Sequence, residues 1–156
     1  MQTAEFLRLF PMRAPNIMWF LGAGASAAAR IPTAWDMLWE FKRALYCSER
    51  NASPKALGDL GDVAIRRRLQ IYFDARGAFP AENADDEYAQ YFEAAYPHEM
   101  DRRRYIEQQI AAGTPSFGHR VLALLLQQGK VRLVWTTNFD RMVEDSAVAA
   151  LGSYSA

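Results

Sequence analysis

Two short segments hold the side chains best suited to binding and reaction. The first, Phe20-Leu21-Gly22-Ala23-Gly24-Ala25-Ser26, is an apolar run that ends in a glycine-rich turn. Such a turn lets backbone N–H groups approach a pyrophosphate closely. The second, Thr136-Thr137-Asn138-Phe139-Asp140, places two hydroxyls, an amide and a carboxylate after another apolar run. Together the two segments predict a nucleotide site with reactive groups beside it.

The glycine turn fits a relaxed dinucleotide-binding fingerprint, Gly22-x-Gly24-x-x-Ala27. In that pattern Gly22 permits a tight turn, Gly24 admits a phosphate, and Ala27 lets the helix pack closely on the strand. The alternative is a plain strand-to-helix turn that uses small residues for packing. A dehydrogenase is not favoured, because no second strand ends in an acidic residue about 20 positions later. Asp36 is better explained as the capping-box partner of Thr33.

The second segment also has two interpretations. In a binding site, Asn138 can orient a hydroxyl or a water, and Asp140 can accept from a carboxamide or stabilise a developing cation. The alternative is helix capping. Asn138 is then the N-cap of a helix that begins at Phe139, and Asp140 lies at the positive end of that helix.

Hydrophobic spacing predicts a mostly helical chain with two strands. The continuous apolar run at 17–21 is typical of a strand buried on both faces, and 131–135 is the second strand. The predicted helices are 3–10 (stopped by Pro11), one after Thr33, one opened by Ser53-Pro54, 63–73, 84–96, 99–112, one opened by Thr114-Pro115, and 139–151. The predicted fold class is therefore α/β, an incomplete Rossmann-like parallel sheet with a large helical insertion at about residues 50–113.

Composition narrows the function classes. The 156 residues are 51% hydrophobic with a formal net charge of zero, which favours a packed globule and disfavours nucleic acid as a partner. We expect Arg66–Arg68 and Arg102–Arg104 to be solvated helix faces.

The single cysteine, Cys47, allows neither a disulfide within the chain nor a four-cysteine zinc module. With no secretory signal and no apolar run of about 20 residues, we expect a cytoplasmic protein without a membrane partner.

The order of the motifs resembles the sirtuin family. It consists of the glycine turn, Ile31-Pro32, Pro115-Ser-Phe-Gly-His119 with its leucine-rich helix, and the segment 136–140. The resemblance spans roughly residues 17–148 and implies that 1–156 is one NAD-binding domain, with Asn138 orienting the water or ribose hydroxyl and Asp140 contacting the nicotinamide carboxamide. It implies cofactor contacts at Gly22, Ala23, Gly24, Ala25, Ser26, Pro32, Thr33, Thr136 and Thr137.

Departures from the family pattern select a subgroup. Protein-deacylating sirtuins continue from Ile-Pro into Asp-Phe-Arg and carry a zinc module, whereas this chain has Thr33-Ala34-Trp35 and one cysteine. That pattern is similar to the zinc-free sirtuin-like domains of bacterial anti-phage defence proteins, which hydrolyse NAD to nicotinamide and ADP-ribose. The resemblance implies an effector domain that hydrolyses NAD as its substrate and needs no metal. It also implies a C-terminal sensor module or a partner protein, and it is compatible with a homo-oligomer. The alternatives are an NAD-dependent protein deacylase and a non-catalytic NAD- or ADP-ribose-binding module.

The catalytic base is not accounted for. The family uses a histidine in a His-Gly motif downstream of its Asn-Ile-Asp, and no histidine follows Asp140 here. His119 lies on an apolar helix face, where we expect a hydrogen-bonded structural role, and His98 receives no role. A sheet of two strands is also too small for a stable core. We therefore expect the domain to be truncated at its C-terminus.

Overall fold

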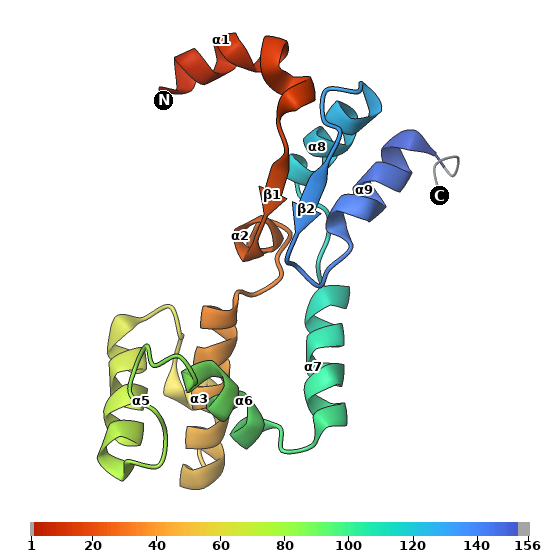
Figure 1. Cartoon of the computed structure of the whole chain (residues 1–156). Coiled ribbons are helices and arrows are strands. Elements are labelled where there is room, and N and C mark those ends of the chain that lie inside the picture. Colours follow the sequence, from red (N-terminus) through yellow and green to blue (C-terminus); the bar gives the residue numbers. More distant parts are fainter. Residues whose placement is uncertain (1, 153–156) are drawn as a thin grey trace. The chain divides into compact units, whose positions relative to one another are not determined.

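The computed structural model describes residues 2–152, which form helices and one short parallel sheet (Figure 1). The chain divides into two units. The sheet unit consists of the described residues of 1–31 and 110–156, and the helical unit consists of residues 32–109. Each unit has its own cluster of buried apolar side chains. The described chain is thus of mixed α/β composition and mostly helical.

The sheet unit contains two strands, which are parallel as expected, but the second was predicted at 131–135 and begins only at Val134. Trp19, Phe20 and Leu21 pair with Val134, Trp135 and Thr136, respectively. Helices α8 and α9 pack against each other beside this sheet (Figure 1). The elements of the unit are α1 (Thr3–Arg13), η1 (Ala14–Asn16), β1 (Trp19–Leu21), α2 (Ala23–Ala27), α8 (Phe117–Gln127), β2 (Val134–Thr136) and α9 (Met142–Leu151).

The prediction that the first strand is buried on both faces is wrong. Trp19 and Leu21 lie on the face toward α8, where they line a pocket. Phe20 is 67% exposed, and its cross-strand partner Trp135 is 56% exposed. Alternate residues of a strand point to opposite faces, so the two aromatic rings share the outer face. An apolar run predicts a strand here, but it does not reveal which of its faces is covered.

Helix α1 differs from its prediction at Pro11. The helix was expected to stop there, yet it continues to Arg13 with the proline inside it. A proline in this position removes the N–H that would bond to the carbonyl of Leu7. Leu7 is 64% exposed, so water can satisfy that carbonyl. The helix is tied to the sheet by Phe10, whose ring meets the Trp19 ring edge-on.

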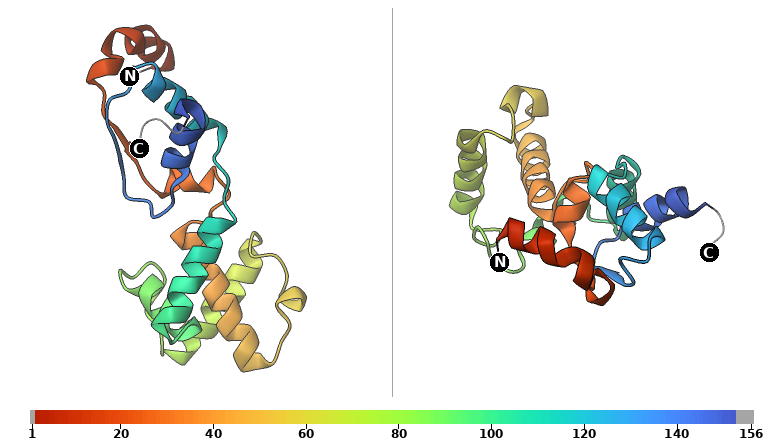
Figure 2. Two further views of the ribbon diagram at one scale, coloured as in Figure 1. Left: turned by 90° about the vertical axis from the view of Figure 1, so that its right-hand side faces the viewer. Right: turned by 90° about the horizontal axis from the view of Figure 1, so that it is seen from above.

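The helical unit is built around the longest helix, α3 (Ala34–Arg50), which contacts α4, α5 and α6. Figure 2 shows α3 in orange with α5 in yellow-green beside it. Its core is rich in aromatic rings, with Phe41 stacked on Phe92 at 4.7 Å between centroids. The remaining elements are α4 (Pro54–Leu57), α5 (Val63–Arg76), α6 (Glu87–Ala95) and α7 (Glu99–Ala111), of which α7 extends two residues past the unit boundary.

The ends of α3 follow from its sequence. Thr33 and Asp36 form the predicted capping box, in which the Thr33 hydroxyl accepts from the Asp36 N–H and the Asp36 carboxylate accepts from the Thr33 N–H. The helix ends at Asn51, which adopts the left-handed conformation that asparagine tolerates. Ser53 and Pro54 open α4, also as predicted. Cys47 is free and buried in the core.

A buried lysine was not anticipated. Lys42 is fully buried and pairs with Glu87, and its ammonium also donates to the Gln70 side chain at 2.6 Å. The ammonium lies 4.4 Å from the centroid of the Trp39 ring and 4.8 Å from that of Tyr91. Its position between Leu38 and Tyr46 on the apolar face of α3 was the available signal. Through these contacts Lys42 connects α3 to Gln70 of α5 and to Glu87 of α6.

Candidate functional site

The glycine turn leads directly from β1 into the short helix α2, with Gly22 as its N-cap. The expectation that Gly22 is needed for a tight turn is wrong. Its φ of −119° and ψ of −170° are extended values that any residue adopts. A Cβ placed on Gly22 or Gly24 meets no atom within 4 Å among the described residues. Internal packing and backbone conformation therefore do not account for either glycine.

Ala27 does not have the packing role that the fingerprint assigns to it, because it is exposed. The buried small residues of this segment are Ser26 and Ala29, at 6% and 1% exposure. The carbonyl of Ser26 accepts the N–H groups of both Ala29 and Ile31, which turns the chain after α2. Helix α2 is thus held through Ser26, on the side facing the second strand end.

Ser26 and Asp140 join the two motifs. The Ser26 hydroxyl donates to Oδ2 of Asp140. The other carboxylate oxygen, Oδ1, accepts the N–H of Met142 at 3.1 Å, at the first residue of α9. Asp140 therefore lies at the positive end of that helix, as the capping interpretation predicted. Each carboxylate oxygen retains a second lone pair for a ligand.

Asn138 makes the second link. Its Nδ2 donates to the carbonyl oxygen of Gly22 at 2.9 Å, and the same carbonyl accepts the N–H of Ala25. The prediction that Asn138 caps a helix beginning at Phe139 is wrong, because α9 begins at Met142 with Arg141 as its N-cap. Because β1 and β2 pair in parallel, the Asn138 side chain lies beside the end of the first strand and bonds there instead.

The two threonines complete the second strand end. The N–H of Thr137 donates to the Leu21 carbonyl at 3.2 Å, which extends the parallel ladder by one bond. The Thr136 hydroxyl accepts the N–H of Asn138 at 3.0 Å. Both threonines are exposed. The carboxyl ends of the two strands thus present a continuous polar edge, the usual ligand-binding edge of parallel sheets.

Two of the expected cofactor contacts lie in the other unit. Pro32 and Thr33 open the helical unit, so the sheet-unit site is built without them. The Thr33 hydroxyl also donates to the Asp36 carboxylate at 2.6 Å as part of the α3 cap. The structure brings together seven of the sequence-predicted residues in the sheet unit by hydrogen bonding or chain adjacency, which are Gly22, Gly24, Ser26, Thr136, Thr137, Asn138 and Asp140. Ala23 and Ala25 lie between them in α2.

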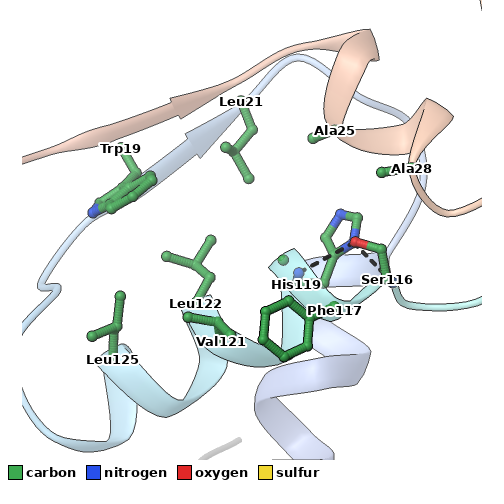
Figure 3. A pocket seen from close by; sticks show the side chains of 11 residues that line it. Trp19, Leu21, Ala25, Ala28, Ser116, Phe117, His119, Val121, Leu122 and Leu125 are labelled. Atoms are coloured by element: carbon green, nitrogen blue, oxygen red, sulfur yellow. Dashed lines mark hydrogen bonds between the residues drawn. The ribbon is translucent and has the colours of Figure 1, made fainter. Parts of the chain in front are cut away.

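His119 has the hydrogen-bonded structural role that was expected. It is 4% exposed and forms a capping box with Ser116, the N-cap of α8, in place of the predicted opening at Thr114. Sequence reasoning missed the pocket beside it, which lies between β1, α2 and α8 (Figure 3). The small residues of the glycine turn were the available signal, because small side chains leave room next to a helix.

Three further features of residues 2–152 concern metal ligands, membrane-spanning helices and the arginine clusters. This part of the chain holds no group of three or more His, Cys, Asp or Glu side chains arranged to bind a metal. None of its helices combines the length and apolar character needed to cross a bilayer. Several of the clustered arginines are used internally, since Arg66 donates to the Leu60 carbonyl, Arg68 to the Tyr46 hydroxyl and Arg102 to the Tyr96 carbonyl.

Comparison with known proteins adds no assignment. No protein-family model matches the chain, and its sequence has no match among curated proteins.

Proposed function

We propose that the sheet unit binds NAD across the carboxyl ends of β1 and β2 and hydrolyses it to nicotinamide and ADP-ribose. The pyrophosphate lies against Gly22–Ser26, and the nicotinamide ribose lies beside Asn138 and Asp140. NAD is the substrate and no metal takes part. The proposal includes a Rossmann-like arrangement of the sheet and rests on the sirtuin-like order of the motifs.

The observation that carries this proposal is the open space at Gly22 and Gly24. Neither glycine has a positive φ, and a methyl group at either position meets no atom of residues 2–152 within 4 Å. Glycine is useful in such a position when another molecule approaches the backbone. The N–H groups of Ala23 and Gly24, at the first two positions of α2, have no partner within the helix, so α2 offers them to phosphate oxygens, whereas the N–H of Ala25 is bonded to the Gly22 carbonyl. Because α2 has only five residues, these hydrogen bonds contribute more to phosphate binding than the dipole of the helix does.

The reaction breaks the bond between C1′ of the ribose and N1 of nicotinamide. The electron pair of that bond moves to N1 and neutralises the pyridinium, while the oxygen of a water molecule bonds to C1′ and one proton of that water passes to a second water molecule. The developing positive charge at C1′ favours a nearby carboxylate, which Asp140 supplies. Asn138 keeps its Oδ1 available to orient the water or the ribose hydroxyl while Nδ2 holds Gly22.

Hydrolysis is proposed ahead of deacylation because the chain lacks the Asp-Phe-Arg segment and the four cysteines of protein deacylases. A cytoplasmic effector of prokaryotic anti-phage defence, controlled by a sensor module or partner protein, is the setting that the resemblance favours.

Three measurements on the same protein preparation test the proposal. Incubation with NAD is expected to release nicotinamide and ADP-ribose in equal amounts. Deacylation of an acyl-lysine peptide, with nicotinamide released only when the peptide is present, would instead favour the deacylase. Calorimetric binding of NAD without nicotinamide release would favour a binding module. Absence of both binding and release would contradict the assignment of the site.

A further inference from the structure

The sheet unit contains an apolar pocket that the proposed NAD chemistry does not use. Its volume is about 340 Å³, which falls within the range of small-molecule sites. Trp19 and Leu21 of β1 form one wall, and Val121, Leu122 and Leu125 of α8 form the opposite wall (Figure 3). The pocket lies on the α8 face of the sheet, whereas the proposed NAD site lies at the strand ends.

The space exists because α2 contributes only small side chains to it. Ala25 and Ala28 line the pocket, and neither has atoms beyond Cβ to fill the gap between α2 and α8. Aromatic rings stand at two places on the lining, the indole of Trp19 and the ring of Phe117. Rings of this kind favour another flat ring, by edge or offset-stacked contact.

The hydrogen bonds of His119 determine which of its two ring nitrogens can donate to a ligand. His119 Nδ1 accepts the backbone N–H of Ser116 at 3.2 Å and lies 2.8 Å from the Ser116 hydroxyl. In a neutral imidazole the hydrogen is therefore on Nε2, which becomes a donor. Nε2 makes no hydrogen bond to any residue that the structure describes. The ring stands between α8 and the two alanines of α2 (Figure 3), and the residue is 4% exposed.

We propose that this pocket binds a fused bicyclic aromatic molecule with a single hydrogen-bond acceptor on its rim, which accepts from His119 Nε2. The apolar walls of β1 and α8 cover the ring faces, and the imidazole fixes the orientation of the ligand in the pocket. This proposal does not depend on NAD binding, although Ala25 belongs to the glycine turn as well as to the pocket lining.

The test uses two probes of similar shape, quinoline with a ring nitrogen and naphthalene without one. Both are titrated into the whole chain at neutral pH, and the amide NMR signals of Ala25 and Gly118 report binding. Quinoline is expected to bind about fivefold more tightly than naphthalene, the ratio expected from one net hydrogen bond. If neither probe shifts these signals up to its solubility limit, the pocket is not a binding site.

Substitution of the histidine tests the donor. His119→Glu places a carboxylate at the third position of α8, where it can still complete a capping box with Ser116 but, when ionised, has no hydrogen to donate to a ligand. The fold is expected to persist, and the preference for quinoline is expected to fall to about one while naphthalene still binds. An unchanged preference in this variant, or equal affinities in the wild type, would overturn the role assigned to Nε2.

A second pair of variants tests the location. Ala28→Phe places a ring in the pocket and is expected to abolish binding of both probes. Ala27→Phe is the matched control, because Ala27 is the exposed neighbour that does not line the pocket. Binding that survives Ala28→Phe would place the probes elsewhere. Gly24→Ala separates this site from the proposed NAD site, since it is expected to weaken NAD binding and leave quinoline binding unchanged.

Discussion

Asn138 Nδ2 donates a hydrogen bond of 2.9 Å to the carbonyl oxygen of Gly22, across 116 positions of sequence. The bond joins the end of the second strand to the first residue after β1. A side chain assigned to the reaction thus also holds the turn assigned to the phosphates. Ser26 and Asp140 repeat this arrangement with a hydroxyl and a carboxylate. The two strand ends are therefore one hydrogen-bonded cluster.

Substitution of Asn138 is expected to abolish nicotinamide release with little loss of folding. Asn138→Ala removes the amide that orients the water or ribose hydroxyl, and it costs about 1 kcal/mol of unfolding free energy through the lost bond to Gly22. Nicotinamide release and urea unfolding are measured on the same samples. Asn138→Asp is the control variant. Its side chain has nearly the same size, but its carboxylate cannot donate a hydrogen bond to the Gly22 carbonyl. Turnover retained in Asn138→Ala would contradict the catalytic role of this residue.

Gly24→Ala is expected to separate ligand binding from stability. A Cβ at Gly24 meets no atom of the described residues within 4 Å, and alanine favours a helix more than glycine does, so the unfolding free energy stays the same or rises by up to about 1 kcal/mol. NAD affinity, measured by calorimetry, is expected to fall at least about tenfold, because the methyl group occupies the position proposed for a phosphate.

Gly113→Ala is the opposite control for that variant. A Cβ there lies 2.6 Å from Cγ1 of Ile31 and 2.8 Å from Cε of Met142, so the neighbours must move. This change is expected to cost about 1–3 kcal/mol of stability, with NAD affinity of the folded protein retained. If Gly24→Ala instead destabilises the chain as much as Gly113→Ala does, the glycine serves packing and not a ligand.

A double-mutant cycle measures the bond between Ser26 and Asp140. Ser26→Ala, Asp140→Ala and the double variant are compared by urea unfolding. Because the acceptor is a carboxylate and the serine is buried, we expect a coupling free energy of about 1.5–3 kcal/mol. A cycle of Thr136→Val with Asp140→Ala is the reference, since these two side chains share no hydrogen bond in the described structure. A coupling near zero for the first pair would mean that the bond does not contribute to stability.

The sequence predicted the elements better than the contacts between them. Apolar spacing and caps were enough for the two strands and for the start of α3 at Thr33, because these signals are local. The bond from Asn138 to Gly22 depends on the register of β1 with β2, which no local pattern contains. The exposure of Phe20 was missed for a related reason, since apolar character does not reveal which neighbour covers a strand. At the site, the residue types were predictable and their pairing was not.

The buried pair of Lys42 and Glu87 gives a prediction for the helical unit. Lys42→Met removes the cation and leaves a carboxylate that is 3% exposed without its partner, which is expected to cost about 3–5 kcal/mol. Lys42→Met combined with Glu87→Gln removes both charges and is expected to recover more than half of that loss. Urea unfolding measures both variants. Equal stability of the single and double variants would show that the ion pair is not what holds α3 against α6.

Tyr91→Phe is expected to leave stability unchanged or raise it by up to about 1 kcal/mol. Tyr91 is fully buried, and its hydroxyl has no hydrogen-bond partner in the part of the chain that the structure describes. Removing such a group removes a desolvation cost, while the phenyl ring keeps its stacking on Phe79 and its contact with the Lys42 ammonium.

The same variant has a pH signature. Burial, and then the negative charges of Glu87 and Asp74, raise the pKa of Tyr91 above its ordinary value of 10.0. As the pH rises through 10, the unfolded tyrosine ionises while the folded one keeps its proton, so the folded state loses stability. Below that pH the contribution is fully present. Unfolding free energies of wild type and Tyr91→Phe are therefore expected to diverge above pH 10, with the variant falling less steeply. Parallel curves at alkaline pH would mean that the Tyr91 hydroxyl titrates equally in both states, which its burial should prevent.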